Sequence, residues 1–482
     1  MSLQQSMNEA NPGRATSQST PAAMARPGLI AGAWGAVAGA AGEGFGARQI
    51  MTWMTKGGMA IADQGLITGS NFLLSILLAR WMSREEYGAF ALGFSVFLLV
   101  AVLYQALLLE PMSVFGGSSY HAQLRTYLRS LLAIHVFAGL AILFGLALSS
   151  GIARVAGSAA GLPGSLLGAA VAAPCMLMFW LVRRAFYLRL SSAFALAGAV
   201  LYCVIVVGGL FLLQHYGFLS SFTAFTLMGA GGLLSGGLLL FCLHHQLDAN
   251  HSALRLGEVW RRHWEYGRWA LLCAAAMWIP ANMYYPLISS FHGVASAGEL
   301  KALLNFFNPI FQTYGALSLL LLPYAARRRS QGVHAGALTW RITLLCASGT
   351  ILYWIVVIAF KGTAFRLLYS GRYMDVAHLL PVVALGSVFE NAFFGPAIVL
   401  RAMEAPKSVF VALFVAAAIA VAAGIPATRY FGVAGAVWSQ TLSSIAGFAV
   451  AVALLRGKLD APHAIPVQQG SALVAAQLET EA

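Results

Sequence analysis

The chain has 482 residues, of which 59% are hydrophobic and only 9% are charged, whereas about a quarter of the residues in an ordinary soluble domain are charged. This composition excludes a soluble enzyme or binding module and indicates an integral membrane protein, because each crossing helix needs about 20 mainly apolar residues. The net charge of +13 would fit a nucleic-acid partner, but the basic residues are gathered in alternate loops, as the orientation rule for membrane proteins requires.

Twelve apolar segments are long enough to cross a membrane. They lie at about 57–80, 89–109, 130–150, 162–182, 192–213, 221–243, 267–289, 302–324, 340–360, 377–400, 407–426 and 432–455. We therefore predict an all-α polytopic membrane protein with about 12 transmembrane helices in two pseudo-repeated six-helix bundles around a central cavity. The expected division is a flexible tail with an interfacial segment (1–56), a first bundle (57–243), a cytoplasmic linker (244–266), a second bundle (267–456) and a flexible tail (457–482).

The loop charges predict which side each terminus faces. With both termini in the cytoplasm, 21 of the 29 Lys and Arg residues fall on the cytoplasmic side, which is the distribution that the orientation rule favours. The other side keeps eight, among them Arg80, Arg84 and Lys301. The basic excess also attracts anionic lipid headgroups. The five cysteines lie in or at the ends of apolar helices without paired spacing, so the sequence suggests neither a disulfide framework nor a metal site.

A weak internal repeat relates the two halves. Residues 77–88 align without gaps with residues 287–298, which places Gly88 on Gly298, and apolar runs flank both. Such a repeat suggests two similar halves that face one another, the arrangement in which transporters place a pathway at the repeat interface. The alternative is chance, because any two hairpins with glycine turns can be aligned.

Polar residues concentrate in the first two predicted helices of each half. They are Asp63, Gln64, Asn71 and Gln105 in the first half, and Asn282, Asn305, Asn308 and Gln312 in the second. An isolated lipid-facing helix would not tolerate them, so they must face protein or a water-filled cavity. For any one of them a hydrogen bond between packed helices is the simpler explanation. Their matching places in two halves favour a pathway. Pro280 and Pro286 predict that the seventh helix is bent.

The tenth predicted helix carries Glu390 and Asn391 close to Gly395 and Pro396. A carboxylate at membrane depth is costly and is by default a functional candidate, for proton coupling or for a cavity wall. The alternative is an interhelical hydrogen bond made by a neutral Glu390. His135, among apolar residues of the third predicted helix, is interpreted as a packed histidine.

No enzyme motif is present. The sequence has no P-loop, no GxSxG and no HExxH, and the connections on the side away from the cytoplasm are short. A membrane glycan polymerase or ligase would need a large loop with acid and base residues, so the short loops argue against one.

Four segments resemble one family. Residues 77–96 (LLARWMSREEYGAFALGFSV), 365–386 (FRLLYSGRYMDVAHLLPVVALG), 402–414 (AMEAPKSVFVALF) and 430–444 (YFGVAGAVWSQTLSS) are similar to the signatures of bacterial polysaccharide and oligosaccharide flippases (Wzx-type), in the multidrug, oligosaccharidyl-lipid and polysaccharide exporter superfamily. The resemblance implies alternating access that carries a polyprenyl pyrophosphate-linked oligosaccharide across the bacterial inner membrane. It implies no cofactor. The implied partners are this lipid-linked substrate, membrane lipids and other polysaccharide assembly proteins, and a monomer can suffice because each half can pack on the other.

The resemblance leaves the phosphate contact open. Relatives that flip the lipid-linked peptidoglycan precursor use several cavity arginines, but the predicted spans place no Lys or Arg deep in helices 1, 2, 7 or 8. The candidates for a phosphate contact are therefore Lys56, Arg80 and Arg268, which lie at helix ends. A second hypothesis is a cation-coupled drug or metabolite antiporter of the same superfamily, with Asp63 and Glu390 as cation sites.

Overall fold

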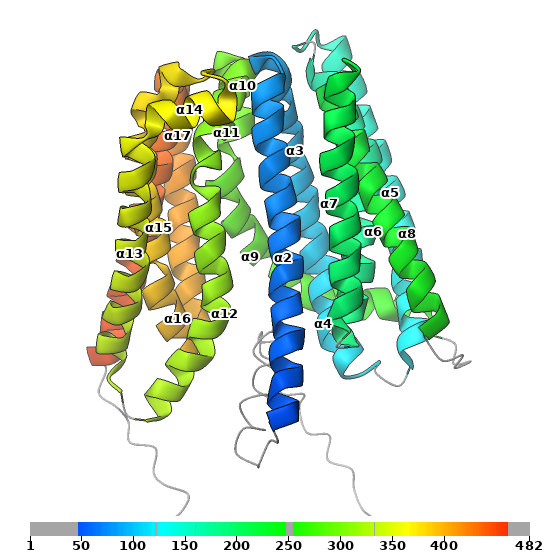
Figure 1. The fold of residues 1–482 in the computed structure, drawn as a ribbon. Helices are drawn as coiled ribbons and strands as arrows, with labels where there is room; N and C mark the ends of the chain where they lie inside the picture. The colour runs from blue at the N-terminus through cyan, green and yellow to red at the C-terminus, as the bar shows by residue number, and fades with distance from the viewer. Residues whose placement is uncertain are drawn as a thin grey trace, which may run out of the picture.

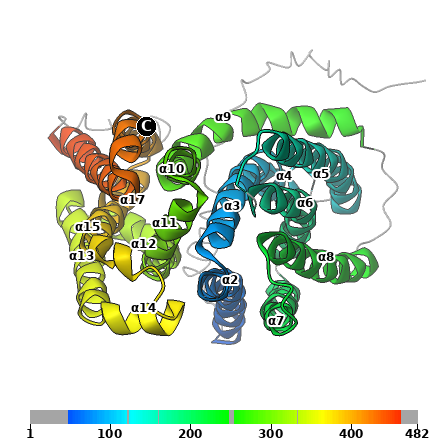
Figure 2. The ribbon, with the colours of Figure 1, turned by 90° about the horizontal axis from the view of Figure 1, so that it is seen from above.

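The computed structural model describes residues 47–120, 123–159, 161–189, 191–246, 254–331 and 333–460. The predictions for the first 46 residues and for the tail after Asp460 lie outside the described residues. Within the described ranges the chain is all helical, without a strand. The helices form two groups that stand side by side (Figures 1 and 2), which we call the N-terminal and C-terminal lobes.

The N-terminal lobe contains the first seven labelled helices and one π-helical turn. They are α2 (Ala47–Trp81), α3 (Arg84–Tyr104), η1 (Gln105–Leu109), α4 (Glu110–Gly117), α5 (Leu124–Val155), α6 (Gly161–Leu188), α7 (Ser192–His215) and α8 (Ser221–Gln246).

The C-terminal lobe contains the remaining elements. They are α9 (Leu256–Asn282), α10 (Tyr284–His292), α11 (Val294–Asn305), α12 (Asn308–Ser330), α13 (Ala335–Ala359), α14 (Lys361–Tyr369), η3 (Met374–Leu379), α15 (Leu380–Ala392), α16 (Phe394–Ala402) and α17 (Pro406–Asp460).

Eight of the described helical segments are long and apolar enough to cross a membrane, or nine if the bent pair α9–α10 counts as one. The predicted bend of the seventh helix is confirmed, since α9 and α10 meet at 42°. Pro280 lies in the last turn of α9, where a proline removes one backbone hydrogen bond and kinks the helix. Two other predicted crossings are interrupted or begin early: α11 and α12 are separate helices, and α9 begins at Leu256, inside the predicted linker.

The 55-residue α17 is two helices joined at Gly432, whose φ of 57° and ψ of −131° are not helical. Residues before Gly432 contact residues after it, and successive contacting pairs lie farther from Gly432 along the chain on both sides. A Cβ on Gly435 would lie 1.9 Å from the carbonyl oxygen of Ala427, and Ser443 Oγ donates to the carbonyl oxygen of Ala416 at 2.8 Å. The two halves of α17 therefore run antiparallel, as the predicted spans 407–426 and 432–455 require.

The turn between α2 and α3 is fixed by a side-chain cap. Ser83 Oγ accepts a hydrogen bond from the backbone N–H of Glu86 at 3.1 Å, and Glu85 and Glu86 place negative charge in the first turn, where the helix dipole favours it. The Glu86 carboxylate in turn accepts from the backbone N–H of Ser221 at 2.8 Å, at the start of α8. The charged turn thus organises two helix N-termini of the same lobe.

Helix α9 joins the lobes. Its first half packs on the π-helical turn of the N-terminal lobe, where Gly267 lies so close that a Cβ would come within 2.9 Å of the carbonyl oxygen of Ala106. The fully buried His263 donates from Nδ1 to the carbonyl oxygen of Leu107 at 3.0 Å, because a carbonyl only accepts. Its Nε2 therefore accepts from the Tyr127 hydroxyl at 2.7 Å. Burial lowers the pKa of His263 to about 4, so the ring is neutral at pH 7.

Candidate functional site between the two lobes

The lobes are in backbone contact where α3 crosses α11. A Cβ on Gly88 would lie 1.9 Å from the carbonyl oxygen of Val294, and a Cβ on Gly298 would lie 3.0 Å from the carbonyl oxygen of Arg84. Small residues permit such close helix crossings in membranes. Val294 and Arg84 each precede the glycine of their own helix by four residues, so the contact is symmetric. The two segments of the sequence repeat, which aligns Gly88 with Gly298, therefore contact one another at this crossing.

This crossing lies at one end of the molecule, which we call the closed end. It carries the turns α2–α3, α10–α11 and α14–η3, and in Figure 1 it is at the top. Toward the opposite end, α2 and α12 diverge (Figure 1).

A buried polar network joins the lobes beside the glycine contact. Ser75 Oγ donates to Asn305 Oδ1 at 2.9 Å, and Asn305 Nδ2 donates to the Tyr87 hydroxyl at 2.9 Å and the Tyr369 hydroxyl at 3.4 Å. Tyr87 completes the ring with Ser75 at 3.0 Å. Each of these four residues is at most 6% exposed. Buried polar groups that are fully paired hold one arrangement tightly, because leaving any of them unpaired is costly.

Charged residues close the rim of the contact. The Arg84 guanidinium binds both carboxylate oxygens of Asp375 at 2.8 Å and Glu299 at 3.2 Å, so an arginine of α3 is held by acids from η3 and α11. A planar guanidinium suits such two-point contacts. Arg372, in the turn that precedes η3, donates to the carbonyl oxygen of Met82. The α14–η3 turn is therefore fastened to the α2–α3 turn by both side chains.

Tyr373 occupies the centre of this rim with an unusual backbone. Its φ is 62°, a left-handed conformation that is unfavourable for a bulky residue. The side chain is fully buried, with its ring 5.2 Å from the Arg84 guanidinium and 6.1 Å from the Tyr87 ring. The contacts of its ring with Arg84 and Tyr87 hold Tyr373 in this conformation when the lobes are in contact at the closed end.

Lys301 lies in the same lobe contact, on α11. The predicted spans leave it in a loop before the eighth helix, but the structure places it inside a helix and 8% exposed. Its ammonium nitrogen is 4.6 Å from the centre of the Phe94 ring and 5.9 Å from those of Phe90 and Tyr285. No acidic partner holds this ammonium among the described residues. A buried cation among aromatic faces is costly, and cation–π attraction offsets about 0.5–2 kcal/mol of that cost.

The structure divides the predicted site residues among the N-terminal lobe, the lobe contact and the C-terminal lobe. Of these residues, Asn305 takes part in the lobe contact described above. Asn308 and Gln312 are exposed on α12, Asn282 is half-buried at the end of α9, and Gln105 is exposed at the start of the π-helical turn. Asn71 is half-buried, and its Oδ1 is buried without a hydrogen-bond partner in the described part of the chain.

Asp63 and Gln64 contact Arg183 within the N-terminal lobe. Asp63 is fully buried, with Oδ2 3.2 Å from Arg183 Nε and accepting a hydrogen bond from the Tyr187 hydroxyl. Arg183 also donates to Gln64 Oε1 at 3.1 Å. The negative charge of Asp63 on α2 is thus compensated by Arg183, near the end of α6.

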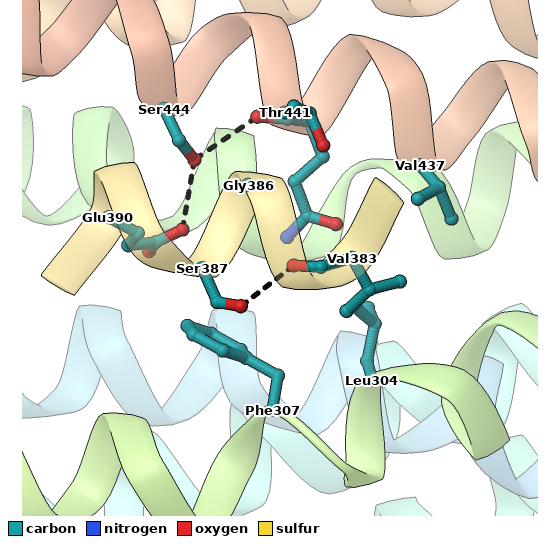
Figure 3. A pocket seen from close by; sticks show the side chains of 10 residues that line it. Leu304, Phe307, Val383, Gly386, Ser387, Glu390, Val437, Thr441 and Ser444 are labelled. Carbon is teal, nitrogen blue, oxygen red and sulfur yellow. Dashed lines mark hydrogen bonds between the residues drawn. The ribbon is translucent and has the colours of Figure 1, made fainter. Parts of the chain in front are cut away.

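Glu390 and Asn391 belong to the interior of the C-terminal lobe. Glu390 accepts from Ser444 Oγ at 3.0 Å, beside a small pocket of about 20 Å³ that is also lined by Leu304, Phe307, Ser387 and Thr441 (Figure 3). Figure 3 shows the Glu390 carboxylate pointing from α15 toward α17. Asn391 is fully buried and donates to Thr350 Oγ1 at 3.1 Å.

The candidates for a phosphate contact are apart from this pocket. Arg80 donates to the carbonyl oxygen of Leu367 at 2.6 Å, at the closed end. Arg268 is exposed on α9, and the side chain of Lys56 lies outside the described residues. Sequence patterns did not single out Lys301, Ser75 and Tyr87 as parts of one contact. The internal repeat was the signal that could have found them, because Lys301 follows the aligned Gly298 by three residues.

Comparisons with known proteins agree on the fold. No family model and no curated protein sequence matches the chain. An inward-facing multidrug resistance MATE transporter of the MOP superfamily superposes with a TM-score of 0.68 at 12% identity, covering 83% of this chain and 98% of the transporter. The lipid II flippase MurJ in an inward closed conformation gives 0.66 at 15% identity, covering 83% and 87%. An outward-facing MATE transporter gives 0.59 at 11% identity, covering 85% and 95%.

These neighbours are transporters rather than enzymes, and at such low identity they define the fold and no more. The chain is a multi-pass helical membrane protein with the two-lobed fold of MOP superfamily transporters.

Proposed function

We propose that the protein is a flippase that moves a polyprenyl pyrophosphate-linked oligosaccharide, of the exopolysaccharide or O-antigen type, across the bacterial inner membrane by alternating access. The observation that carries this proposal is Lys301. Its ammonium is 8% exposed between the lobes and is surrounded by Phe90, Phe94 and Tyr285. Such a positive charge favours an anionic substrate and repels a cationic drug.

The chemistry of such a substrate fits a contact between lobes. Its pyrophosphate and sugars need a polar path across the hydrocarbon layer, whereas its polyprenyl tail can remain in lipid. Lys301 supplies positive charge, and the hydroxyls and amide of the neighbouring network supply hydrogen bonds that sugars can use when the lobes separate. One structural neighbour is the lipid II flippase MurJ, so this fold is compatible with a lipid-linked substrate.

The loop charges support an orientation. Arg80, Arg84 and Lys301, assigned from the sequence to the side away from the cytoplasm, all lie at or near the closed end. We therefore place both termini in the cytoplasm and the closed end outward, so that substrate reaches Lys301 from the cytoplasmic side. In this scheme the six-helix bundles at 57–243 and 267–456 move relative to one another as domains, and a monomer is sufficient.

A second candidate function is a cation-coupled drug or metabolite antiporter. The observation in its favour is Glu390, a carboxylate beside a pocket in the C-terminal lobe with Ser444 as its hydrogen-bond partner. The buried Asp63 supports this alternative less, because Arg183 already compensates its charge. Dye efflux driven by sodium or protons would favour the antiporter, and indifference to both gradients would count against it.

The test of the leading proposal is deletion of the gene in its native bacterium, followed by analysis of surface polysaccharide and of lipid-linked sugar intermediates by leaflet. Loss of polymer with complete units held in the inner leaflet supports flipping. Complementation with Lys301→Arg should restore more polymer than Lys301→Gln, since only arginine keeps the charge. Normal polymer and normal intermediates in the deletion strain would refute the proposal, and units held in the outer leaflet would indicate a polymerase.

A further inference from the structure

One short helix carries both the Lys301 ammonium and the contacts that close the lobes. Val294, Gly298, Lys301 and Asn305 are spaced by four, three and four residues, so they share one face of α11. That face lies on α3: Gly298 meets Gly88, Lys301 faces Phe94 and Asn305 bonds to Tyr87. Any rotation or shift that moves Lys301 therefore also moves the glycine contact and the polar network.

Breaks on both sides separate α11 from its neighbours. Before it, Gly293 has φ 88° and ψ 163°, a conformation that essentially only glycine adopts. After it, Phe306 and Phe307 keep helical dihedrals, but their N–H groups bond to carbonyls only three residues back before α12 begins at Asn308. A helix of 12 residues bounded in this way can move as a unit, since backbone rotation at a few residues absorbs the change.

We propose that α11 couples anion binding at Lys301 to separation of the lobes at the closed end; this inference rests on the proposed function. A pyrophosphate offers the ammonium charge-assisted hydrogen bonds, which are stronger than its contact with Phe94. Drawing Lys301 away from Phe94 moves Gly298 off Gly88 and withdraws Asn305 from Tyr87 and Ser75. The pyrophosphate thus binds more tightly to the separated state than to the closed one, which is what drives the change.

The contact is suited to two states rather than to gradual opening. At Gly88 there is no room for even a methyl group, so the helices are either in backbone contact or apart. The groups of the network are paired with one another when the lobes are closed, and water can pair them when the lobes separate. Arg84 and Asp375 at the rim are already partly exposed, so hydrating them costs little.

The first test uses the reciprocity of coupling. In the full chain with its five native cysteines replaced by alanine, Ser75→Cys and Asn305→Cys are combined, and oxidation joins positions 75 and 305 with the lobes closed. Farnesyl pyrophosphate serves as the probe and farnesol as its uncharged control. The oxidised protein should bind farnesyl pyrophosphate at least about fivefold more weakly than the same protein after reduction. Lys301→Gln should weaken binding in the background without the two new cysteines.

A second measurement needs no disulfide. Spin labels at Glu85→Cys and Leu367→Cys, both exposed, report the distance across the closed end in nanodiscs. Farnesyl pyrophosphate should lengthen this distance, farnesol should not, and Lys301→Gln should abolish the response.

The outcomes separate the two proposals. If wild-type protein does not bind farnesyl pyrophosphate, the proposed function itself fails. If it binds through Lys301, but affinity is equal in the oxidised and reduced proteins and the label distance does not change, then the anion site stands and the coupling role of α11 is refuted.

Discussion

Gly88 and Gly298 each lie against the helical turn that precedes the other glycine. A Cβ on Gly88 would point at the carbonyl oxygen of Val294. Because the two glycines occupy matching places in the two halves of the chain, this contact marks the pseudo-twofold relationship between the lobes. Arg84, Asn305 and Lys301 lie around this contact and join the two lobes there.

Gly88→Ala should open the closed end. The added methyl would lie 1.9 Å from a backbone oxygen, and neither helix can yield without shifting, so the closed state should lose about 1–3 kcal/mol. The measurement is the thermal unfolding midpoint together with the label distance across the closed end. The matched control is Gly145→Ala, in α5, where nothing lies within 4 Å and alanine should be neutral or slightly stabilising. Equal effects of the two substitutions would contradict the contact.

Asn305→Leu should destabilise the lobe contact by about 2–3 kcal/mol, because it leaves the buried hydroxyls of Ser75 and Tyr87 without their amide partner. Gln312→Leu, at an exposed position of the next helix, should change stability by no more than about 0.5 kcal/mol. Thermal unfolding of both variants checks this difference. A loss of polysaccharide with Gln312→Leu at unchanged stability would instead support the prediction that Gln312 lines the pathway.

Arg183→Gln should be more destabilising than Asp63→Asn. Removing the arginine leaves a fully buried carboxylate with the Tyr187 hydroxyl as its remaining partner, and breaking a buried pair from one side typically costs about 3–5 kcal/mol. The double substitution should recover much of the loss. If Asp63→Asn abolishes transport while its stability and that of the double variant are preserved, Asp63 acts as a coupling site rather than as a structural partner.

Acid should loosen α9 from the N-terminal lobe. Burial lowers the pKa of His263 to about 4, below the ordinary value near 6.5, so the unfolded chain binds the proton more readily. Stability is therefore full above pH 6.5 and declines as the pH falls toward 4, by up to about 3 kcal/mol. His263→Gln should reduce the difference in unfolding midpoint between pH 7 and pH 5. An unchanged difference would show that His263 does not govern it.

The crossing helices and the bend of the seventh helix were predictable from the sequence because they depend on local chemistry. Apolar runs of about 20 residues predicted the crossing helices, since lipid leaves the backbone no alternative, and Pro280 predicted the bend in the seventh helix. The resemblance selected the superfamily whose fold the structure confirms. The Wzx-type assignment and the roles of the site residues remain proposals.

The candidate site was less predictable. Counting polar residues along the chain grouped Asp63, Asn305 and Glu390, but the structure distributes them among the N-terminal lobe, the lobe contact and the C-terminal lobe. Hydropathy gives the depth of a residue and not the neighbour it faces. Lys301 shows the limit most clearly, because a charged residue at the edge of an apolar run is assigned to a loop unless its aromatic surroundings are known.

Local patterns in the sequence predicted a polytopic helical membrane protein, because hydrocarbon thickness and backbone hydrogen bonding act on each segment separately. The weak repeat suggested two related halves. The contacts of Gly88 with Gly298, of Arg84 with Asp375 and of Lys301 with Phe90 and Phe94 became known from the folded structure alone. These pairs join segments some 200 to 290 residues apart, and their partners are chosen by the packing of whole lobes, which no local pattern encodes.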